Sequence, residues 1–215
     1  MCRFLLAKSK KLIKPYQLLH SFSLMAKNSK AFDGDWQGDG WGITWLEAKS
    51  WKLYKSLFPI WEEFGKFNNF PKTNLFAIHA RSASFSRHKN NIDYNQPFVN
   101  GSRIFMFNGF LKGVRFPYQI PGDIGAQKIW YLLQKQLETV NPVIALNNIK
   151  QLLKKNTKEI QALNIGLADI NNIYTLNYYT KYPDYYKLHY FQNSTLELIC
   201  SESFWSRFNI HRSPE

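Results

Sequence analysis

The chain has 215 residues, of which 45% are hydrophobic, 17% aromatic and 20% charged, and its formal net charge is +13. A chain of this length and composition can bury a large core, which excludes a disordered protein and predicts a single globular domain over residues 1–215. The two cysteines are too few for a disulfide framework, and no apolar run is long enough to cross a bilayer, so we expect a cytoplasmic protein with no membrane role.

The N-terminal half predicts four strands and two helices. The expected strands cover residues 2–8, 41–47, 50–55 and 73–81, and the expected helices cover residues 15–29 and 59–67. A loop rich in Gly and Asp, over 32–40, leads into the hairpin. A polar loop over 82–102 ends this half, and a loop of that length inside a compact domain is often functional.

The C-terminal half predicts one strand, two helices and then a run of strands. The first strand covers 103–109 and ends in a turn at the Asn-Gly pair, and the helices cover 125–139 and 141–155. The remaining strands cover 162–170, 173–180, 185–191 and 196–203. Strands followed by helices and again by strands favour an α+β fold in which two packed sheets are covered by helices.

Cys2 is the first residue suited to chemistry. A cysteine attacks as the thiolate, and once Met1 is removed its own α-amine can act as the base beside the sulfur. The alternative is an ordinary small apolar residue at the start of a strand. Cys2 alone favours the ordinary residue, because many proteins begin with Met-Cys by chance.

Two later positions also allow two interpretations. Arg81, at the end of an apolar strand, is suited to bidentate capture of a carboxylate or to a salt bridge at the sheet end. Asn108 and Gly109 form either a turn or an oxyanion hole, in which the side-chain amide and a backbone N–H meet the same developing charge. We expect His79 to be a strand residue with a satisfied ring and no catalytic role.

Metals, cofactors and nucleic acid are not expected. The five histidines and Cys200 are scattered, which predicts no metal site, and no phosphate-binding glycine loop precedes a helix. The Lys and Arg residues are spread along the chain without an RNA- or zinc-type motif, so the positive charge does not predict a nucleic acid partner.

The order of the motifs is more specific than any one of them. Cys2-Arg3 is followed by "DGWGITW", "HAR", "NQPF", "FNGFL", "GDIGAQ" before a helix, and a strand ending in "ICSES". This ordered set resembles the class-II glutamine amidotransferases, especially their small stand-alone members, which are N-terminal nucleophile hydrolases. The resemblance runs from residue 1 to about residue 204, and it implies a four-layer αββα fold with two mainly antiparallel sheets.

The resemblance also implies roles for individual residues. Cys2 would be the nucleophile that attacks the side-chain amide of glutamine, with its α-amine as general base, and Asn108 and Gly109 would form the oxyanion hole. Arg81 would bind the substrate α-carboxylate. Substrate-binding positions are also expected at Trp41, Gly42 and Asp123. The implied partners are a small amide substrate and a separate synthase subunit that receives ammonia.

The chain departs from the family pattern at the turn before the first long C-terminal helix. Gly125 stands where the family has the Asp that binds the α-ammonium of glutamine, and Gln127 stands where Glu is usual. Losing one partner of a buried charge pair costs about 3–5 kcal/mol. Gln96 and Phe107 replace two histidines that are common in the family, which makes the pocket more apolar.

These departures leave three functions open. The first is an amide hydrolase that acts on free glutamine. The second keeps the chemistry but acts on a γ-glutamyl or other amide without a free α-amine, which would not need the missing Asp. The third is a catalytically impaired protein that binds a ligand through the pocket that holds the substrate in the family.

Overall fold

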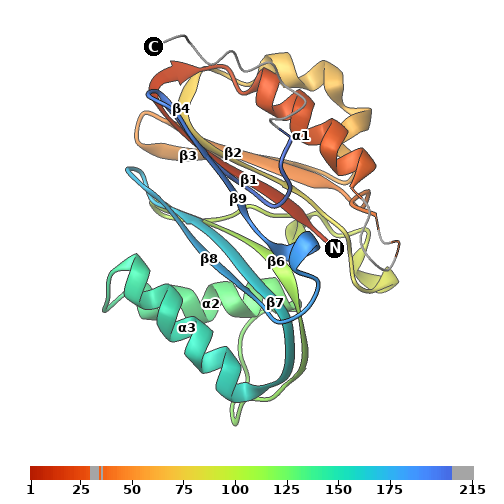
Figure 1. The fold of residues 1–215 in the computed structure, drawn as a ribbon, viewed down its shortest axis with the longest axis vertical. Coiled ribbons are helices and arrows are strands. Elements are labelled where there is room, and N and C mark those ends of the chain that lie inside the picture. The colour runs from red at the N-terminus through yellow and green to blue at the C-terminus, as the bar shows by residue number, and fades with distance from the viewer. Residues whose placement is uncertain (30–33, 35, 205–215) are drawn as a thin grey trace.

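The computed structural model describes residues 1–29, 34 and 36–204, which form two antiparallel sheets (Figure 1). The larger sheet has the order β3-β2-β4-β1-β10-β9. Its strands are β1 (Arg3–Ile13), β2 (Trp41–Glu47), β3 (Ser50–Ser56), β4 (Thr73–Ala80), β9 (His189–Gln192) and β10 (Leu196–Cys200). The smaller sheet has the order β5-β6-β7-β8, with β5 (Phe98–Asn100), β6 (Arg103–Val114), β7 (Thr157–Ala168) and β8 (Ile173–Tyr179).

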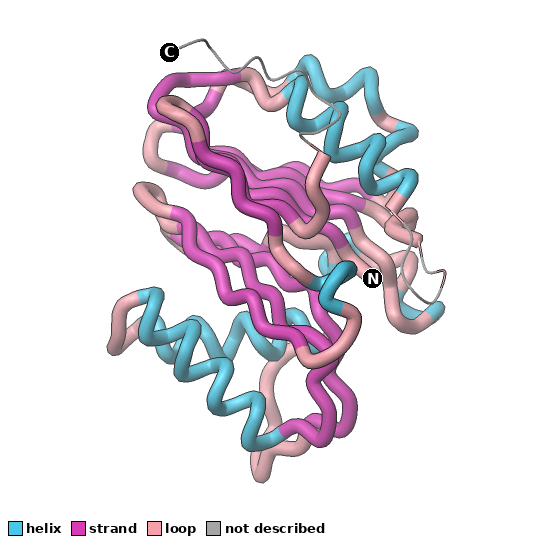
Figure 2. The backbone as a smooth tube through the Cα atoms, viewed as in Figure 1, coloured by secondary structure: helices cyan, strands magenta, loops and turns pink. Residues whose placement is uncertain are grey.

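Helices cover the outer face of each sheet. α1 (Tyr16–Asn28) lies on the larger sheet, and α2 (Gly125–Leu137) and α3 (Pro142–Asn156) lie on the smaller one (Figures 1 and 2). The two sheets face each other between these helical layers. The expected four-layer αββα fold is therefore confirmed.

Strand β1 shows why the layers pack in this way. Its side chains alternate between the two faces of the sheet. Leu5 and Ala7 join the apolar cluster beneath α1, whereas Phe4 and Leu6 join the cluster between the sheets. A further cluster lies between the smaller sheet and the pair α2 and α3. The central strand thus supplies two layers of the core.

Several elements differ from the sequence expectations. β1 continues through the lysine-rich segment to Ile13, and residues 59–67 fold into 3₁₀ turns, Ile60–Glu62 and Phe64–Asn69, instead of one helix. The expected strand 185–191 is shorter, because the left-handed Tyr182 and then Pro183 start the short helix α4 (Pro183–Tyr186). The loop expected over 32–40 lies partly outside the described residues.

The expected turn at Asn108-Gly109 is wrong. β6 passes through both residues and continues to Val114, with Asn108 opposite Asn164 and Gly109 opposite Leu163 on β7. The pairing with β7 overrides the local turn preference of the Asn-Gly pair. Among the described helices, none is long and apolar enough to cross a membrane.

Candidate active site

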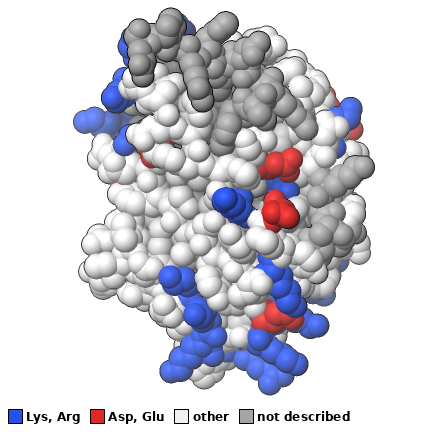
Figure 3. Space-filling model, viewed as in Figure 1, with Lys and Arg blue, Asp and Glu red and all other residues white. Residues whose placement is uncertain are grey.

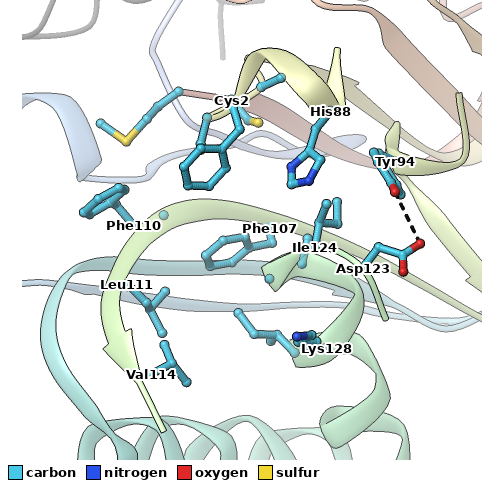
Figure 4. Close-up of a pocket in the computed structure, with 18 of the residues that line it drawn as sticks. Cys2, His88, Tyr94, Phe107, Phe110, Leu111, Val114, Asp123, Ile124 and Lys128 are labelled. Carbon is cyan, nitrogen blue, oxygen red and sulfur yellow. Dashed lines mark hydrogen bonds between the residues drawn. The ribbon is translucent and has the colours of Figure 1, made fainter. Parts of the chain in front are cut away.

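Cys2 lies at a cavity of about 570 Å³ that opens beside the ends of β1, β4 and β6. β1 pairs with β4 so that Arg3 faces Ala80, and this register brings Cys2 beside the residues that follow β4. The half-buried Cys2 thiol donates to the carbonyl oxygen of Ser82 across 3.6 Å. Figure 4 shows the Cys2 side chain at one end of the cavity, above Phe107 and Phe110.

Met1 occupies a buried site next to Cys2. Its carbonyl oxygen accepts hydrogen bonds from Gln37 Nε2 at 2.8 Å and from the Tyr185 hydroxyl at 3.2 Å. The Tyr186 hydroxyl contacts its sulfur. While Met1 is attached, the nitrogen of Cys2 is an amide and cannot act as a base.

Asn108 is a buried polar side chain that the fold leaves unsatisfied. It is 1% exposed, and neither Oδ1 nor Nδ2 has a hydrogen-bond partner among the described residues. Its strand neighbours on either side, Phe107 and Gly109, both line the cavity. Leaving a buried amide unpaired costs about 1–3 kcal/mol, so an orphan of this kind calls for an explanation.

Gly109 is required by close packing of strands. A Cβ at this position would overlap the carbonyl oxygen of Ala162 on β7. Glycine here lets β6 and β7 approach each other while the backbone of residue 109 borders the cavity.

The guanidinium of Arg81 organises the loop 82–95. Nη1 donates to Asn95 Oδ1 at 3.0 Å and to the carbonyl oxygens of Lys89 and Asn91 at 3.3 and 3.5 Å, and Nη2 donates to the carbonyl oxygen of His88. Burial lowers the pKa of Arg81, an effect that nearby Cys2 opposes. Arg81 lines the cavity, but these donors already hold loop oxygens, and capture of a carboxylate stays a prediction.

Asp39 holds the same loop from the other side. Its carboxylate accepts from the backbone N–H of Ala83 at 2.8 Å and pairs with Lys89 at 3.2 Å. The loop 82–95 is therefore tied to the sheet at two points, and it forms one wall of the cavity.

The turn before α2 forms the opposite wall. Asp123 lines the cavity and accepts from the Tyr94 hydroxyl at 3.3 Å, as the dashed line in Figure 4 shows. Gly125, the first residue of α2, also lines it, and a Cβ there would meet nothing within 4 Å. Gln127 Oε1 accepts from the backbone N–H groups of Asp123 and Ile124, at 2.9 and 3.3 Å, so Gln127 closes this turn.

Trp41 and Gly42 are not among the residues that line the cavity, and their binding of substrate stays a prediction. The Trp41 indole is buried in the core beneath α1, where its N–H donates to Glu63 Oε2 at 2.7 Å. A Cβ on Gly42 would lie 2.5 Å from the carbonyl oxygen of Gln96, so this glycine serves close packing. Both residues belong to a central strand whose backbone is paired on each side.

Gln96 and His79 both bond to the backbone of Phe107. The Gln96 side chain accepts from the N–H of Phe107 at 2.6 Å and donates to its carbonyl oxygen at 3.5 Å, so that it behaves like an extra strand residue beside β6. His79 Nε2 lies 3.4 Å from the same oxygen, and burial lowers the pKa of His79 to about 3. The expectation of a fully satisfied His79 ring is wrong, because Nδ1 has no partner among the described residues.

Gln37, Tyr185 and Tyr186 are site residues that sequence reasoning missed. Gln37 lies in a loop, and the two tyrosines were expected in a strand. Their common feature, contact with Met1, depends on segments that are far apart in the chain and leaves no local signal.

The cavity wall is mainly apolar and its charge is mainly positive. Asp123 is the one carboxylate among the described lining residues, beside the cations of Arg81, Arg87, Lys112 and Lys128. Figure 3 shows Lys and Arg side chains gathered at the lower end of the molecule, the end formed by the smaller sheet and its helices. Within the described part of the chain, no group of three or more His, Cys, Asp or Glu side chains could hold a metal ion.

Solved structures share this fold. A glutamine aminotransferase class-II domain protein from Silicibacter pomeroyi superposes with a TM-score of 0.60 at 14% identity, over 93% of this chain and 88% of the other. The glutamine phosphoribosylpyrophosphate amidotransferase from B. subtilis gives a TM-score of 0.64 at 14% identity, over 94% of this chain. This chain covers 42% of the length of that enzyme. No protein-family model and no curated protein sequence matches the chain.

Proposed function

We propose that this chain, which has the fold of class-II glutamine amidotransferase domains, is an amide hydrolase whose nucleophile is Cys2 after removal of Met1. The observation that carries the proposal is the unpartnered, buried amide of Asn108 between two cavity-lining residues on the strand beside Cys2. A donor that the fold leaves unused suits a charge that exists only during the reaction.

The proposed reaction uses only groups of this chain and water. The α-amine of Cys2 takes the thiol proton, and the sulfur attacks the amide carbonyl carbon. The resulting oxyanion accepts hydrogen bonds from Asn108 Nδ2 and the Gly109 N–H. The C–N bond breaks as the α-ammonium protonates the leaving nitrogen, and a thioester remains on Cys2. Water, deprotonated by the same amine, then hydrolyses the thioester to the acid and restores the thiol.

Two kinds of substrate fit this chemistry. One is free glutamine, with the released ammonia passing to a separate synthase subunit. The other is a γ-glutamyl or related amide. The second candidate function, a catalytically impaired binding protein, is favoured by Gly125, because the first residue of α2 has no carboxylate to pair with an α-ammonium.

The nucleophile is tested on protein shown by mass spectrometry to have lost Met1. Such protein is expected to be labelled once by a diazo-ketone analogue of glutamine, and Cys2→Ala should remove both the label and all amide hydrolysis. Cys200→Ala is the matched control. Burial raises the pKa of the Cys200 thiol to about 12, so its loss should change neither readout. Labelling that survives in Cys2→Ala, or native protein that keeps Met1, contradicts the mechanism.

Gly125→Asp tests whether free glutamine is the substrate. The cavity has room for the new side chain, and an Asp in the first turn of α2 should raise the glutamine kcat/KM by about tenfold or more, as expected for a recovered charge pair worth at least about 1.4 kcal/mol. Gly65→Asp is the control, because Gly65 also has open space but lies outside the cavity. Efficient wild-type glutamine hydrolysis that Gly125→Asp leaves unchanged would show that the missing carboxylate is irrelevant.

A further inference from the structure

We propose that the acyl group taken by this site is apolar and uncharged, and that it extends from Cys2 into a subsite between the end of β6 and the helices α2 and α3. The inference rests on the proposed function, since it names the substrate class of the same site. The acyl-binding subsite is lined by Leu111, Val114, Ile124, Ile129, Leu132 and Leu153.

The subsite reaches into the core of the molecule. Leu132 on α2 and Leu153 on α3 belong to the apolar cluster between the helices and the smaller sheet, yet both line the same cavity as Cys2. In Figure 4, Leu111 and Val114 lie at the end of the cavity opposite Cys2, with Phe107 and Phe110 between. An extended apolar group attached to the reacting carbonyl would therefore contact apolar side chains from Cys2 to Val114.

The size of the cavity exceeds what an amino acid side chain requires. Its volume of about 570 Å³ lies within the roughly 300–1,000 Å³ typical of sites that enclose drug-sized ligands. Glutamine, with polar groups at both ends, would leave the apolar part of this space without a matching surface.

Two of the groups that would hold the charged ends of glutamine are engaged or missing. The Nη1 and Nη2 groups of Arg81 donate to four oxygens of the loop 82–95, three of them backbone carbonyls. Gly125, the first residue of α2, has no side chain to meet an ammonium. Lys112 and Lys128 are exposed, so their stems can cover apolar surface while their charged ends stay in water. The part of the site nearest the acyl group is thus suited to a neutral chain.

Hydrolysis of such an amide needs no co-reactant other than water. The thiol of Cys2 adds to the amide carbonyl, the C–N bond breaks with release of ammonia or an amine, and the apolar acyl group becomes a thioester. Hydrolysis of the thioester gives the free carboxylic acid and the thiol.

A series of primary amides tests the inference, because every member releases ammonia and only the acyl group varies. Acetamide, hexanamide, decanamide, 4-phenylbutanamide and glutamine are assayed with Met1-processed protein, and Cys2→Ala provides the blank. We expect kcat/KM to rise with chain length, by up to about fourfold for each methylene that is buried. Glutamine should fall below hexanamide.

Val114→Trp should fill the far end of the subsite. It is expected to lower kcat/KM at least about tenfold more for decanamide than for acetamide, which is too short to reach Val114. Val143→Trp on α3 is the matched control, because both valines are exposed and Val143 lies outside the cavity lining. Equal effects of the two variants on decanamide would overturn the inference.

Calorimetry of decanamide binding to Cys2→Ala tests the subsite separately from the hydrolase. Binding that is lost in Cys2→Ala/Val114→Trp supports the apolar subsite. If the Met1-processed wild type then hydrolyses no amide, the proposed hydrolase alone is overturned. Hydrolysis of glutamine without binding of decanamide would overturn the subsite and support the hydrolase.

Discussion

The cavity is lined by segments of two kinds, strands and loops. The reacting groups beside Cys2 are placed by strand pairing: β1 lies between β4 and β10, and Asn108 and Gly109 lie inside the continuous strand β6. Arg3, directly after Cys2, is 2% exposed and is fixed by Ser29 at 2.8 Å and Glu202 at 3.1 Å. By contrast, Arg81 and Asp123 belong to loops, which are held mainly by side-chain hydrogen bonds.

This difference separates the rigid part of the site from the part that can change. A strand position cannot shift without breaking a ladder of hydrogen bonds, whereas a loop can change residues and length at small cost. The attack groups of the proposed hydrolase therefore lie on the sheets. Arg81 and Asp123 lie on loops, as does Gln96, one of the positions at which the chain departs from the pattern of the family that it resembles.

The largest effect should come from the strand side, at Asn108. Asn108→Ala is expected to lower kcat by about 10²–10³, as loss of an oxyanion donor does elsewhere, while the free energy of unfolding stays level or rises because an unpaired buried amide is removed. The measurements are steady-state kinetics and urea unfolding.

Asn164 is the matched control, since it faces Asn108 across β6 and β7. Its Nδ2 donates to the Tyr186 carbonyl oxygen at 2.7 Å and its Oδ1 accepts from Asn177 at 2.7 Å. Asn164→Ala should therefore destabilise the fold by about 1–3 kcal/mol. If Asn108→Ala instead costs as much stability as Asn164→Ala, Asn108 is a structural residue.

On the loop side, Arg81→Ala should release the loop 82–95. Loss of its charged hydrogen bonds is expected to cost about 1.5–3 kcal/mol in the free energy of unfolding and to make this loop the first site of limited proteolysis. Arg87→Ala, an exposed arginine of the same loop, is the control. Proteolysis that cuts both variants and the wild type alike would show that the Arg81 bonds do not hold the loop.

An effect confined to acid pH should come from His79, which joins the two sheets through the backbone of Phe107. An unfolded histidine takes up a proton near pH 6.5, whereas burial lowers the pKa of folded His79 to about 3. Below about pH 6.5 the unfolded chain therefore binds the extra proton, and stability should fall by up to about 1.4 kcal/mol per pH unit until about pH 3.

His79→Asn and His79→Gln should flatten this dependence between pH 6.5 and 4, measured as the free energy of urea unfolding at each pH. Above pH 7 the wild type loses no stability to this protonation. Variants whose stability falls with the same slope as the wild type would assign the pH dependence to other groups.

Much of the fold is readable from local pattern. The helices α1, α2 and α3 agree with their predicted ranges to within about two residues, because their apolar side chains recur at helical spacing. The hairpin β2–β3 is also predicted. Boundaries failed where partners decide them: β7 begins at Thr157, earlier than expected, because it pairs with the unexpected extension of β6.

The sequence by itself determined the layers of this protein and the identity of its candidate nucleophile, since alternation, helical periodicity and an ordered set of motifs are properties of the chain. Only the tertiary structure decided what Asn108, Arg81 and Gln96 do. Asn108 lies in a strand because β7 pairs with it, Arg81 serves a loop because four acceptors converge on it, and Gln96 completes the edge of β6. Each role depends on segments brought together by packing, and local sequence carries no record of such neighbours.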